Sequence, residues 1–377
     1  MEQRIQHIFP QNIAQALCHT LLHSLWEGLF LAILTGLIIL LTRNSGSALR
    51  YRLLVGALLL YTAIVSLTLV WELNATAGES FGLAGLNPYE WPDFVTALIA
   101  QFNDVLKSAH EHAAMVSGIW LLVVGLQNVR LFFGLYAMER LKRVRVKPAG
   151  GHWQEKINRL GHALGISQAV LLLESAVAKV PMVIGYLKPV VLVPVGLVNS
   201  LEPAQVEAIL LHELAHIRRK DYLVNILQTV LETFFFFNPA VLWLSWLIRL
   251  ERENCCDDAV IHHTQNQIGY MQALVHFEEY RQGLPPQAVA LTGRRGNMLG
   301  RLERILAGNN RSLGKLELII LAVILVLSTV FIAVSPQTPV QSLLKTQYPG
   351  TGSNSKNLEA KKKAEAAERT RHKEPGP

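Results

Sequence analysis

The stretch YLVNILQTVLETFFFFNPAVLWLSWLIRL, Tyr222 to Leu250, decides the fold of this chain. It is almost wholly apolar and long enough to cross a bilayer once. As one straight helix it would be about 40 Å long at 1.5 Å per residue. Asn238-Pro239 lies near its middle, and proline disfavours helical backbone in the residue before it. The stretch is therefore either a single span or a helical hairpin that turns at this dipeptide.

The residues directly before this stretch, LLHELAHIRRKD (Leu210–Asp221), contain a His-Glu-x-x-His motif. On a helix, His212 and His216 are one turn apart on one face, so both imidazoles can reach one metal ion at about 2.0–2.1 Å. Glu213 is adjacent, in the position of a general base that takes a proton from metal-bound water. The alternative is a helix with a charged face, because the motif has only three fixed residues.

The residues directly after it, RLERENCCDDAV (Arg249–Val260), supply further candidates. Glu253 and Asp257 are four residues apart and share one helix face. Catalytic zinc takes three protein ligands, so Glu253 is predicted as the third, with Asp257 accepting a hydrogen bond from a ligand imidazole. Two alternatives stay open. One is a solvated charged helix, and the other is a closed structural site in which Cys255 and Cys256 join the two histidines.

A single crossing by 222–250 would put His216 and Glu253 on opposite sides of the membrane, where they could not share a metal ion. A hairpin at Asn238-Pro239 returns the chain to the side it left. We therefore predict a re-entrant helical hairpin that dips into the bilayer and places the metal site at the membrane surface.

Four other segments are apolar and long enough to span a bilayer: about Leu17–Leu41, Tyr51–Trp71, Met115–Met138 and Leu316–Val334. Basic residues follow the first and the third and precede the fourth, whereas the loop 72–114 is mildly acidic. Basic loops mark the cytoplasmic side. The N-terminus and the tail after Ser335 are thus expected outside, and 139–315 in the cytoplasm.

Composition agrees with a membrane protein, since 51% of the residues are hydrophobic. The formal net charge is +7, but much of the excess lies in the C-terminal tail, so no direct nucleic-acid binding is predicted. The three cysteines, two of them adjacent, give no disulfide framework.

The segment VPMVIGYLKPVVLVP, Val180 to Pro194, is rich in β-branched residues, Gly and Pro. It predicts two short strands with a turn near Gly185. Ser200 is the predicted N-cap of the helix that leads into the metal motif, with Glu202 and Pro203 in its first turn.

The ordered set of these motifs resembles the BlaR/MecR family of integral-membrane zinc metallopeptidases, the beta-lactam-sensing antirepressors. The resemblance rests on HSLWEG, VPMVIGYLKPVVLVP, HELAHIRRKDYL, FNPAVLWLSW, ERENCCD and RLERIL. It implies one Zn²⁺ per chain, with His212, His216 and Glu253 as ligands and Glu213 as catalytic base. The Pro-x-x-x-Gly segment resembles the edge strand of related zinc peptidases, to which a substrate adds as an extra strand. The residues that would make that contact are Val183, Ile184 and Gly185.

The expected fold is an α-helical membrane protein with a small α+β, gluzincin-like metallopeptidase domain. Residues 1–138 would form a bundle of three transmembrane helices with an outer loop at 72–114. The cytoplasmic peptidase domain would span 139–315, including the re-entrant hairpin 222–250, followed by a fourth transmembrane helix at 316–334. Residues 335–377 would be a disordered extracytoplasmic tail.

The resemblance also implies a function in the bacterial inner membrane. The protein would respond to an envelope signal by cutting a cytoplasmic transcriptional repressor, or itself, and homodimers are an open possibility. The loop Leu291–Ile305 is read either as a self-cleavage loop or as an ordinary linker. The tail of about forty residues is too short for the family's penicillin-binding sensor domain, which is expected to be missing. The alternative function is a signal transducer or scaffold that uses this fold without proteolysis.

Overall fold

A computed structural model of the chain describes residues 11–74, 111–185, 188–282, 298–308 and 312–334, with a few isolated positions between 101 and 108 and at 310. The chain divides into two units, Met1–Ser80 with Asp104–Thr329, and Phe81–Asn103 with Val330–Pro377. Nearly all described residues belong to the first unit. Most of the predicted outer loop and the whole predicted tail lie outside the described residues.

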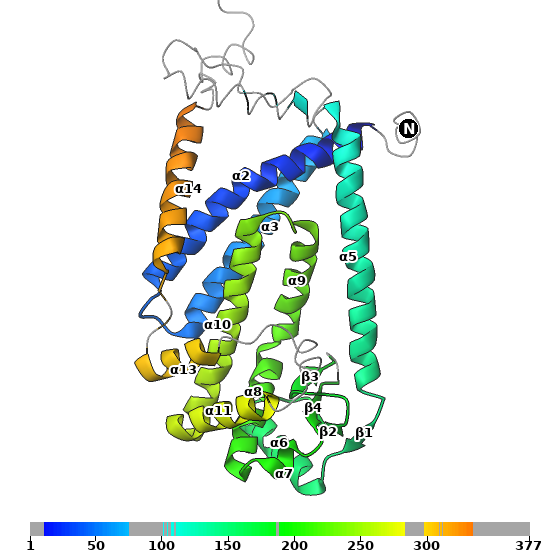
Figure 1. Cartoon of the computed structure of the whole chain (residues 1–377), viewed down its shortest axis with the longest axis vertical. Helices are drawn as coiled ribbons and strands as arrows, with labels where there is room; N and C mark the ends of the chain where they lie inside the picture. Colours follow the sequence, from blue (N-terminus) through cyan, green and yellow to red (C-terminus); the bar gives the residue numbers. More distant parts are fainter. Residues whose placement is uncertain are drawn as a thin grey trace, which may run out of the picture. The chain divides into compact units, whose positions relative to one another are not determined.

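Three long helices are apolar and long enough to cross a membrane: α2 (Gln11–Leu41), α3 (Ser47–Asn74) and α5 (Ala113–Leu141). No proline interrupts them, and their many leucines and alanines favour helix. They cover the first three predicted spans. α2 packs along α3, and α5 contacts α2 and α9 (Figure 1). A further helix, α14 (Lys315–Val334), covers the fourth predicted span, whose crossing of the membrane stays a prediction.

Four short strands form a small sheet in the order β1-β2-β4-β3. The strands are β1 (Val146–Pro148), β2 (Leu171–Ser175), β3 (Met182–Ile184) and β4 (Val190–Pro194). β2 and β4 run parallel, while β1 and β3 pair antiparallel to their neighbours. The two predicted strands are β3 and β4; Gly185, where φ is +97°, follows β3, and residues 186–187 lie outside the described residues. β3 is therefore an edge strand of the sheet.

The sheet packs against helices α6 (Gly151–Ala163), α7 (Leu197–Ser200) and α8 (Pro203–Arg219). Their shared apolar core includes Leu172, Val191 and Leu214. The expected N-cap of α8 was wrong by two residues. Ser200 ends α7, and Glu202 caps α8 through a capping box with Gln205, each side chain bonding the other's backbone.

The apolar stretch folds as a hairpin of α9 (Asp221–Phe234) and α10 (Pro239–Thr264), which contact each other (Figure 1). Asn238 caps α10 by accepting hydrogen bonds from the backbone N–H of Ala240 and Val241, at 3.0 and 3.4 Å. Its amide also donates to the Ser24 carbonyl at 2.8 Å and to the Tyr61 hydroxyl at 3.1 Å. The tip of the hairpin is therefore fixed to both α2 and α3.

Two further helices, α11 (Gln267–Gln282) and α13 (Met298–Ala307), complete the surroundings of the site. The structure describes only the second half of the candidate self-cleavage loop, Leu291–Ile305. Residues 291–297 lie outside the described residues, whereas Met298–Ile305 forms most of α13, and Ile305 is buried. The reading of this segment as a loop or linker is therefore wrong for its second half, which is helical and packs Leu302 and Ile305 against the core.

Candidate metal centre

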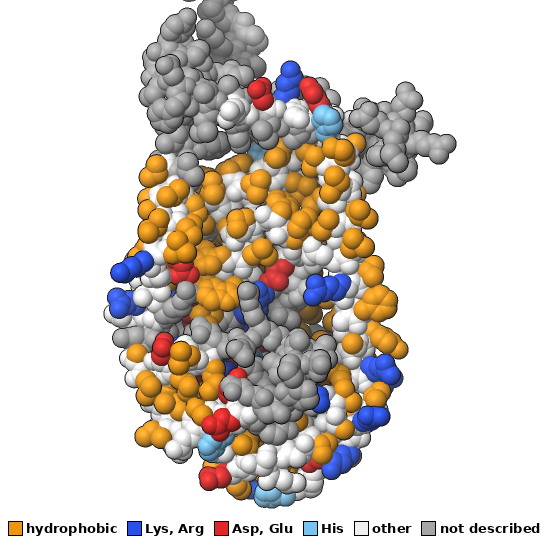
Figure 2. Space-filling model, viewed as in Figure 1, with side chains coloured by type: hydrophobic (Ala, Val, Ile, Leu, Met, Phe, Trp, Pro, Cys, Tyr) orange, Lys and Arg blue, Asp and Glu red, His pale blue; other side chains and the backbone are white. Residues whose placement is uncertain are grey.

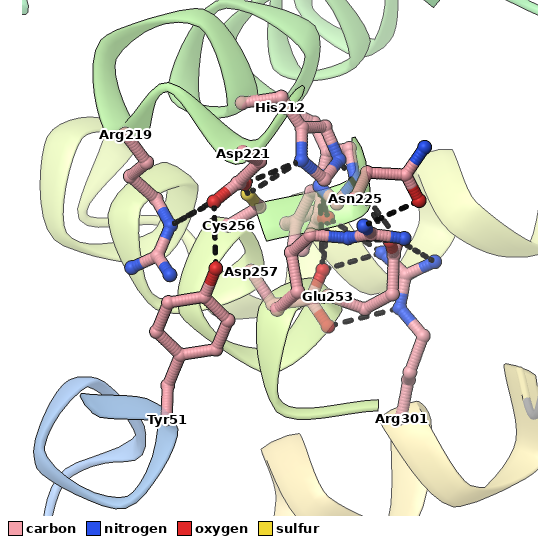
Figure 3. A network of polar contacts seen from close by, with 12 residues as sticks. Tyr51, His212, Arg219, Asp221, Asn225, Glu253, Cys256, Asp257 and Arg301 are labelled. Carbon is pink, nitrogen blue, oxygen red and sulfur yellow. Dashed lines mark hydrogen bonds and ion pairs between the residues drawn. The ribbon is translucent and has the colours of Figure 1, made fainter. Parts of the chain in front are cut away.

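α8 and α10 bring His212, His216 and Glu253 together. His212 and Glu253 are labelled in Figure 3. The two imidazole rings meet edge to face, with centroids 5.0 Å apart. Glu253 Oε2 lies 3.4 Å from His212 Nε2, and its Oε1 lies 3.8 Å from His216 Nε2. One donor atom of each of the three residues lies within 4.8 Å of the others.

This donor set fits a zinc ion. Two ligands held at 2.0–2.1 Å and a tetrahedral angle are about 3.3 Å apart. The two imidazole–carboxylate distances, 3.4 and 3.8 Å, are close to that separation. Both imidazoles direct Nε2 toward the carboxylate, while their Nδ1 atoms face other groups. Histidines that bind metal usually donate from the second nitrogen to such an outer acceptor. The residues could thus hold zinc and leave one position for water.

The Nδ1 atom of His212 faces a cluster of three polar side chains, one each from α10, α11 and α13. His212 Nδ1 lies 3.0 Å from the Tyr270 hydroxyl and 3.4 Å from Asp257 Oδ1. Tyr270 donates to the same carboxylate at 2.7 Å. Arg301 donates to both oxygens of Asp257, with Nε at 2.9 Å from Oδ2. The structure thus places Asp257 beside a candidate ligand, held from its far side by an arginine and a tyrosine.

The outer partner of His216 is Asp221, the first residue of α9. Its Oδ2 lies 2.9 Å from His216 Nδ1. Arg219 Nε donates to Oδ1 of the same carboxylate at 3.3 Å, and the Tyr51 hydroxyl donates to it at 3.4 Å. Lys220, with φ of +55°, turns the chain between α8 and α9 and so brings Asp221 back beside the motif.

Sequence reasoning missed Asp221, Tyr270, Tyr51 and Arg301. Only Asp221 had a local indication, since it is an acidic residue five positions after His216 in the quoted motif. The other three come from α3, α11 and α13, and their contacts to the site depend on tertiary packing.

The electrostatics of the site favour a charged histidine–carboxylate pair in the metal-free protein. Burial lowers the pKa of His212, but its contacts with Asp257 and Glu253 outweigh that and raise it to about 9. Burial raises the pKa of Glu253, but the hydrogen bond and charge of His212 bring it down to about 2. A metal ion must therefore displace the proton of His212.

Glu213 lies between the two histidines on α8 and is half-buried. Burial raises the pKa of its carboxyl above the usual range, against the lowering effect of the nearby histidines. Within the described part of the chain, its carboxylate makes no hydrogen bond or ion pair. It is thus available to handle a proton beside the three donor atoms.

The alternative site with both cysteines is not assembled. Cys255 packs in the apolar cluster between α2, α3 and the hairpin. Cys256 Sγ lies 3.4 Å from His216 Nδ1, and a second donor group of His216, Asp221 and Cys256 exists. Burial and the charge of Asp221 raise the pKa of Cys256 well above its usual value, which disfavours the thiolate that zinc needs.

The predicted substrate strand lies at the edge of the sheet. Val183 and Ile184 belong to β3, which contacts α8, and Gly185 directly follows β3. A Cβ at Gly185 would come within 2.8 Å of the Lys188 carbonyl oxygen, so this position requires glycine. The outer edge of β3 is not paired with any described strand.

Long apolar helices beside a helix with the HExxH motif define a class, the membrane peptidases. Comparison with known families makes this specific. The model for the BlaR1 peptidase M56 family matches residues 93–305, more than half of the chain. The chain therefore belongs to this family, which confirms the resemblance that the motifs indicated.

Two named relatives are similar over part of their length. The chain is 31% identical to the regulatory protein BlaR1 of Bacillus licheniformis over 117 residues, which are 30% of this chain and 19% of the relative. It is 33% identical to the methicillin resistance mecR1 protein of Staphylococcus aureus over 81 residues, 22% of this chain and 14% of the relative. The chain thus matches less than a fifth of each relative.

Proposed function

We propose that the protein is a membrane-embedded zinc endopeptidase of a signalling pathway. The observation that carries the proposal is the convergence of His212, His216 and Glu253, with both imidazoles turned so that Nε2 faces the carboxylate. Membership of a peptidase family supports the same reading. In this proposal the three residues hold one Zn²⁺, and Asp257 and Asp221 orient the two imidazoles.

Bound zinc would supply Lewis-acid activation of water and of the scissile carbonyl. Glu213 takes the proton of the attacking water and passes it to the leaving amine. Its half-buried carboxylate lies beside the two histidines and makes no hydrogen bond or ion pair with a described residue, so it is available for this role. The substrate backbone extends the sheet by pairing with Val183 and Ile184 of β3, next to the turn at Gly185.

We place the hairpin of α9 and α10 within the bilayer. Its tip, Asn238, bonds to Ser24 and Tyr61, which lie near the middle of α2 and α3. Apolar side chains cover the face of the molecule over α2 and α5 (Figure 2). The outward face of α9 carries exposed Leu223 and Ile226. A helix pair with an apolar outer face and a tip at mid-bundle depth fits a re-entrant segment.

The metal centre then lies at the end of the bundle where α3 begins. Tyr51, in the first turns of α3, is within hydrogen-bond distance of Asp221. The basic residues of this side, such as Arg43 and Arg52, favour the cytoplasmic face of the bacterial inner membrane. The N-terminus and the tail are correspondingly outside, and α14 is the fourth transmembrane helix.

The substrate is a cytoplasmic transcriptional repressor, cut in response to an envelope signal. Self-cleavage, where it occurs, falls before Met298, because a substrate must be extended and α13 is helical from that residue. A set of C-terminal fragments that persists in Glu213→Gln would dismiss self-cleavage. Dimerisation is tested by the size of the protein in detergent.

The decisive experiment compares the proteomes of cells with wild-type protein and with Glu213→Ala after envelope stress. The proposal predicts a cytoplasmic protein whose cleavage products disappear in the variant. If zinc is bound but no peptide is cut under any trigger, the protein is a transducer that uses the same fold without proteolysis.

A further inference from the structure

One face of the first turn of α3 carries three buried polar side chains, Ser47, Arg50 and Tyr51. Their spacing of three and four residues puts them on the same side of the helix. They are 3%, 1% and 8% exposed, so they point into the molecule rather than toward lipid or water. A helix of spanning length and composition thus begins with a polar face directed at its neighbours.

Each of the three side chains contacts the peptidase half of the molecule. The Ser47 hydroxyl donates to Asp258 Oδ2. Arg50 Nε lies 3.4 Å from Glu251 Oε1, and both side chains are 1% exposed. Glu251 and Asp258 lie on α10 on either side of Glu253. The first turn of α3 therefore contacts α10 on both sides of the candidate zinc ligand.

The third contact, made by Tyr51, connects α3 to the candidate zinc ligand His216 through Asp221. The Tyr51 hydroxyl donates to Asp221 Oδ1, while Asp221 Oδ2 faces His216 Nδ1. Arg219 lies over the Tyr51 ring, 4.4 Å from its centroid, and donates to the same carboxylate (Figure 3). Asp221 is thus clamped between a membrane helix on one side and His216 on the other.

The most deeply buried of these contacts adds little to the stability of the fold. A buried ion pair such as Arg50–Glu251 contributes little net stability relative to an apolar pair of the same size, because both charges lose water. In some proteins such pairs instead fix the register between two elements. Here the register is that of α3 against the helix that carries Glu253.

We propose that Tyr51 is a positioning residue that holds His216 through Asp221, and that the first turn of α3 thereby couples the membrane bundle to the metal centre. The inference rests on the proposed function as a zinc peptidase. α3 has 28 residues and is about 42 Å long, so it reaches from the site across the bilayer. A shift of α3 by about 1 Å would break the 3.4 Å contact and leave Arg219 and His216 to hold Asp221.

The test uses the full-length protein in detergent and measures zinc affinity by competition with a chelator. Tyr51→Phe removes the hydroxyl but keeps the ring beside Arg219. We expect zinc binding to be weaker by up to about tenfold, because Tyr51 lies one contact beyond Asp221 and removal of the direct partner of a ligand costs about 10- to 100-fold. The matched control is Tyr61→Phe, which also removes a buried hydroxyl from α3. The Tyr61 hydroxyl bonds to Ser24 and Asn238 and does not contact the three candidate zinc ligands. The zinc affinity of this control variant should not change.

A double-mutant cycle makes the route explicit. If Tyr51 acts through Asp221, then Tyr51→Phe should weaken zinc binding less than twofold once Asp221→Asn is present. Additive effects of the two substitutions would overturn the inference, as would an unchanged affinity in Tyr51→Phe. Wild-type protein that binds no zinc would instead refute the proposed function. Should Tyr51→Phe fail to fold, Tyr51→Leu, which also lacks the hydroxyl, takes its place in the same cycle with Asp221→Asn, and additivity there overturns the inference.

Discussion

Replacing Asp257 with asparagine perturbs the best-buried polar group of the site. The Asp257 side chain is fully buried, and its two oxygens face Arg301, Tyr270 and His212. Asparagine keeps the shape but removes the charge. The arginine, whose side chain is 17% exposed, would then be a buried cation without its main partner.

The magnitude follows from that loss. Breaking a buried ion pair by removing one partner costs about 3–5 kcal/mol. The amide oxygen of asparagine can still accept one hydrogen bond, so we expect the lower end, about 3 kcal/mol. Because Asp257 also orients His212, zinc affinity should fall about 10- to 100-fold.

The effect should depend on pH in a defined direction. Burial raises the pKa of Asp257, but the charge and hydrogen bonds of Arg301 and His212 lower it below its usual range. A lowered pKa in the folded state stabilises the protein above the unfolded pKa of about 3.9 and loses that effect as the pH falls further. The difference between wild type and Asp257→Asn should therefore be full at pH 7 and shrink below about pH 4.

The assay is reversible unfolding in mixed micelles, together with chelator competition for zinc. The neighbouring Asp258→Asn is the matched control. Asp258 pairs with Arg304 and accepts from Ser47, but its side chain is 44% exposed and the asparagine oxygen can still accept from Ser47, so the loss of its charge should cost no more than about 1 kcal/mol. Equal effects of the two substitutions, or an Asp257→Asn protein with wild-type stability and zinc affinity, would refute this reasoning.

Three further predictions concern the hairpin and the metal. Gly28→Leu should destabilise the protein by about 1–3 kcal/mol, because a Cβ at Gly28 would lie 2.6 Å from the Asn238 amide, which is held by its own hydrogen bonds. Gly56→Leu is the control and should not change the free energy of unfolding, because a Cβ at Gly56 has no atom within 4 Å. Asn238→Ala should cost about 2–3 kcal/mol in the same unfolding assay, since it removes a helix cap and two buried hydrogen bonds. Zinc binding at pH 7 should release about one proton, because His212 has a pKa of about 9 without metal. Calorimetry in buffers of different ionisation enthalpy measures this, and a buffer-independent enthalpy would contradict it.

The hairpin could be predicted because one constraint decided it. Only a turn at Asn238-Pro239 returns Glu253 to the side of His216, and the structure begins α10 at Pro239. The spacing of His212 with His216, and of Glu253 with Asp257, follows from the helical period alone. These local patterns were enough to identify which side chains the fold brings together.

The partners that orient them could not be predicted. Tyr51 is 170 residues from Asp221, and Tyr270 is 58 residues from His212. No local period connects such positions, so only the packing of α3 and α11 against the site reveals them. The segment before the last helix was misread for another reason. Its glycines and arginines suggested a linker, although Leu302 and Ile305 are spaced as on a helix that packs on the core.

Metal analysis of the purified protein tests the central claim most directly. Wild type and Glu213→Gln should each hold about one zinc ion per chain, because Glu213 is proposed as base and not as ligand. His216→Ala and Glu253→Ala should lose it. Zinc retained at wild-type stoichiometry in both of these variants would contradict the account.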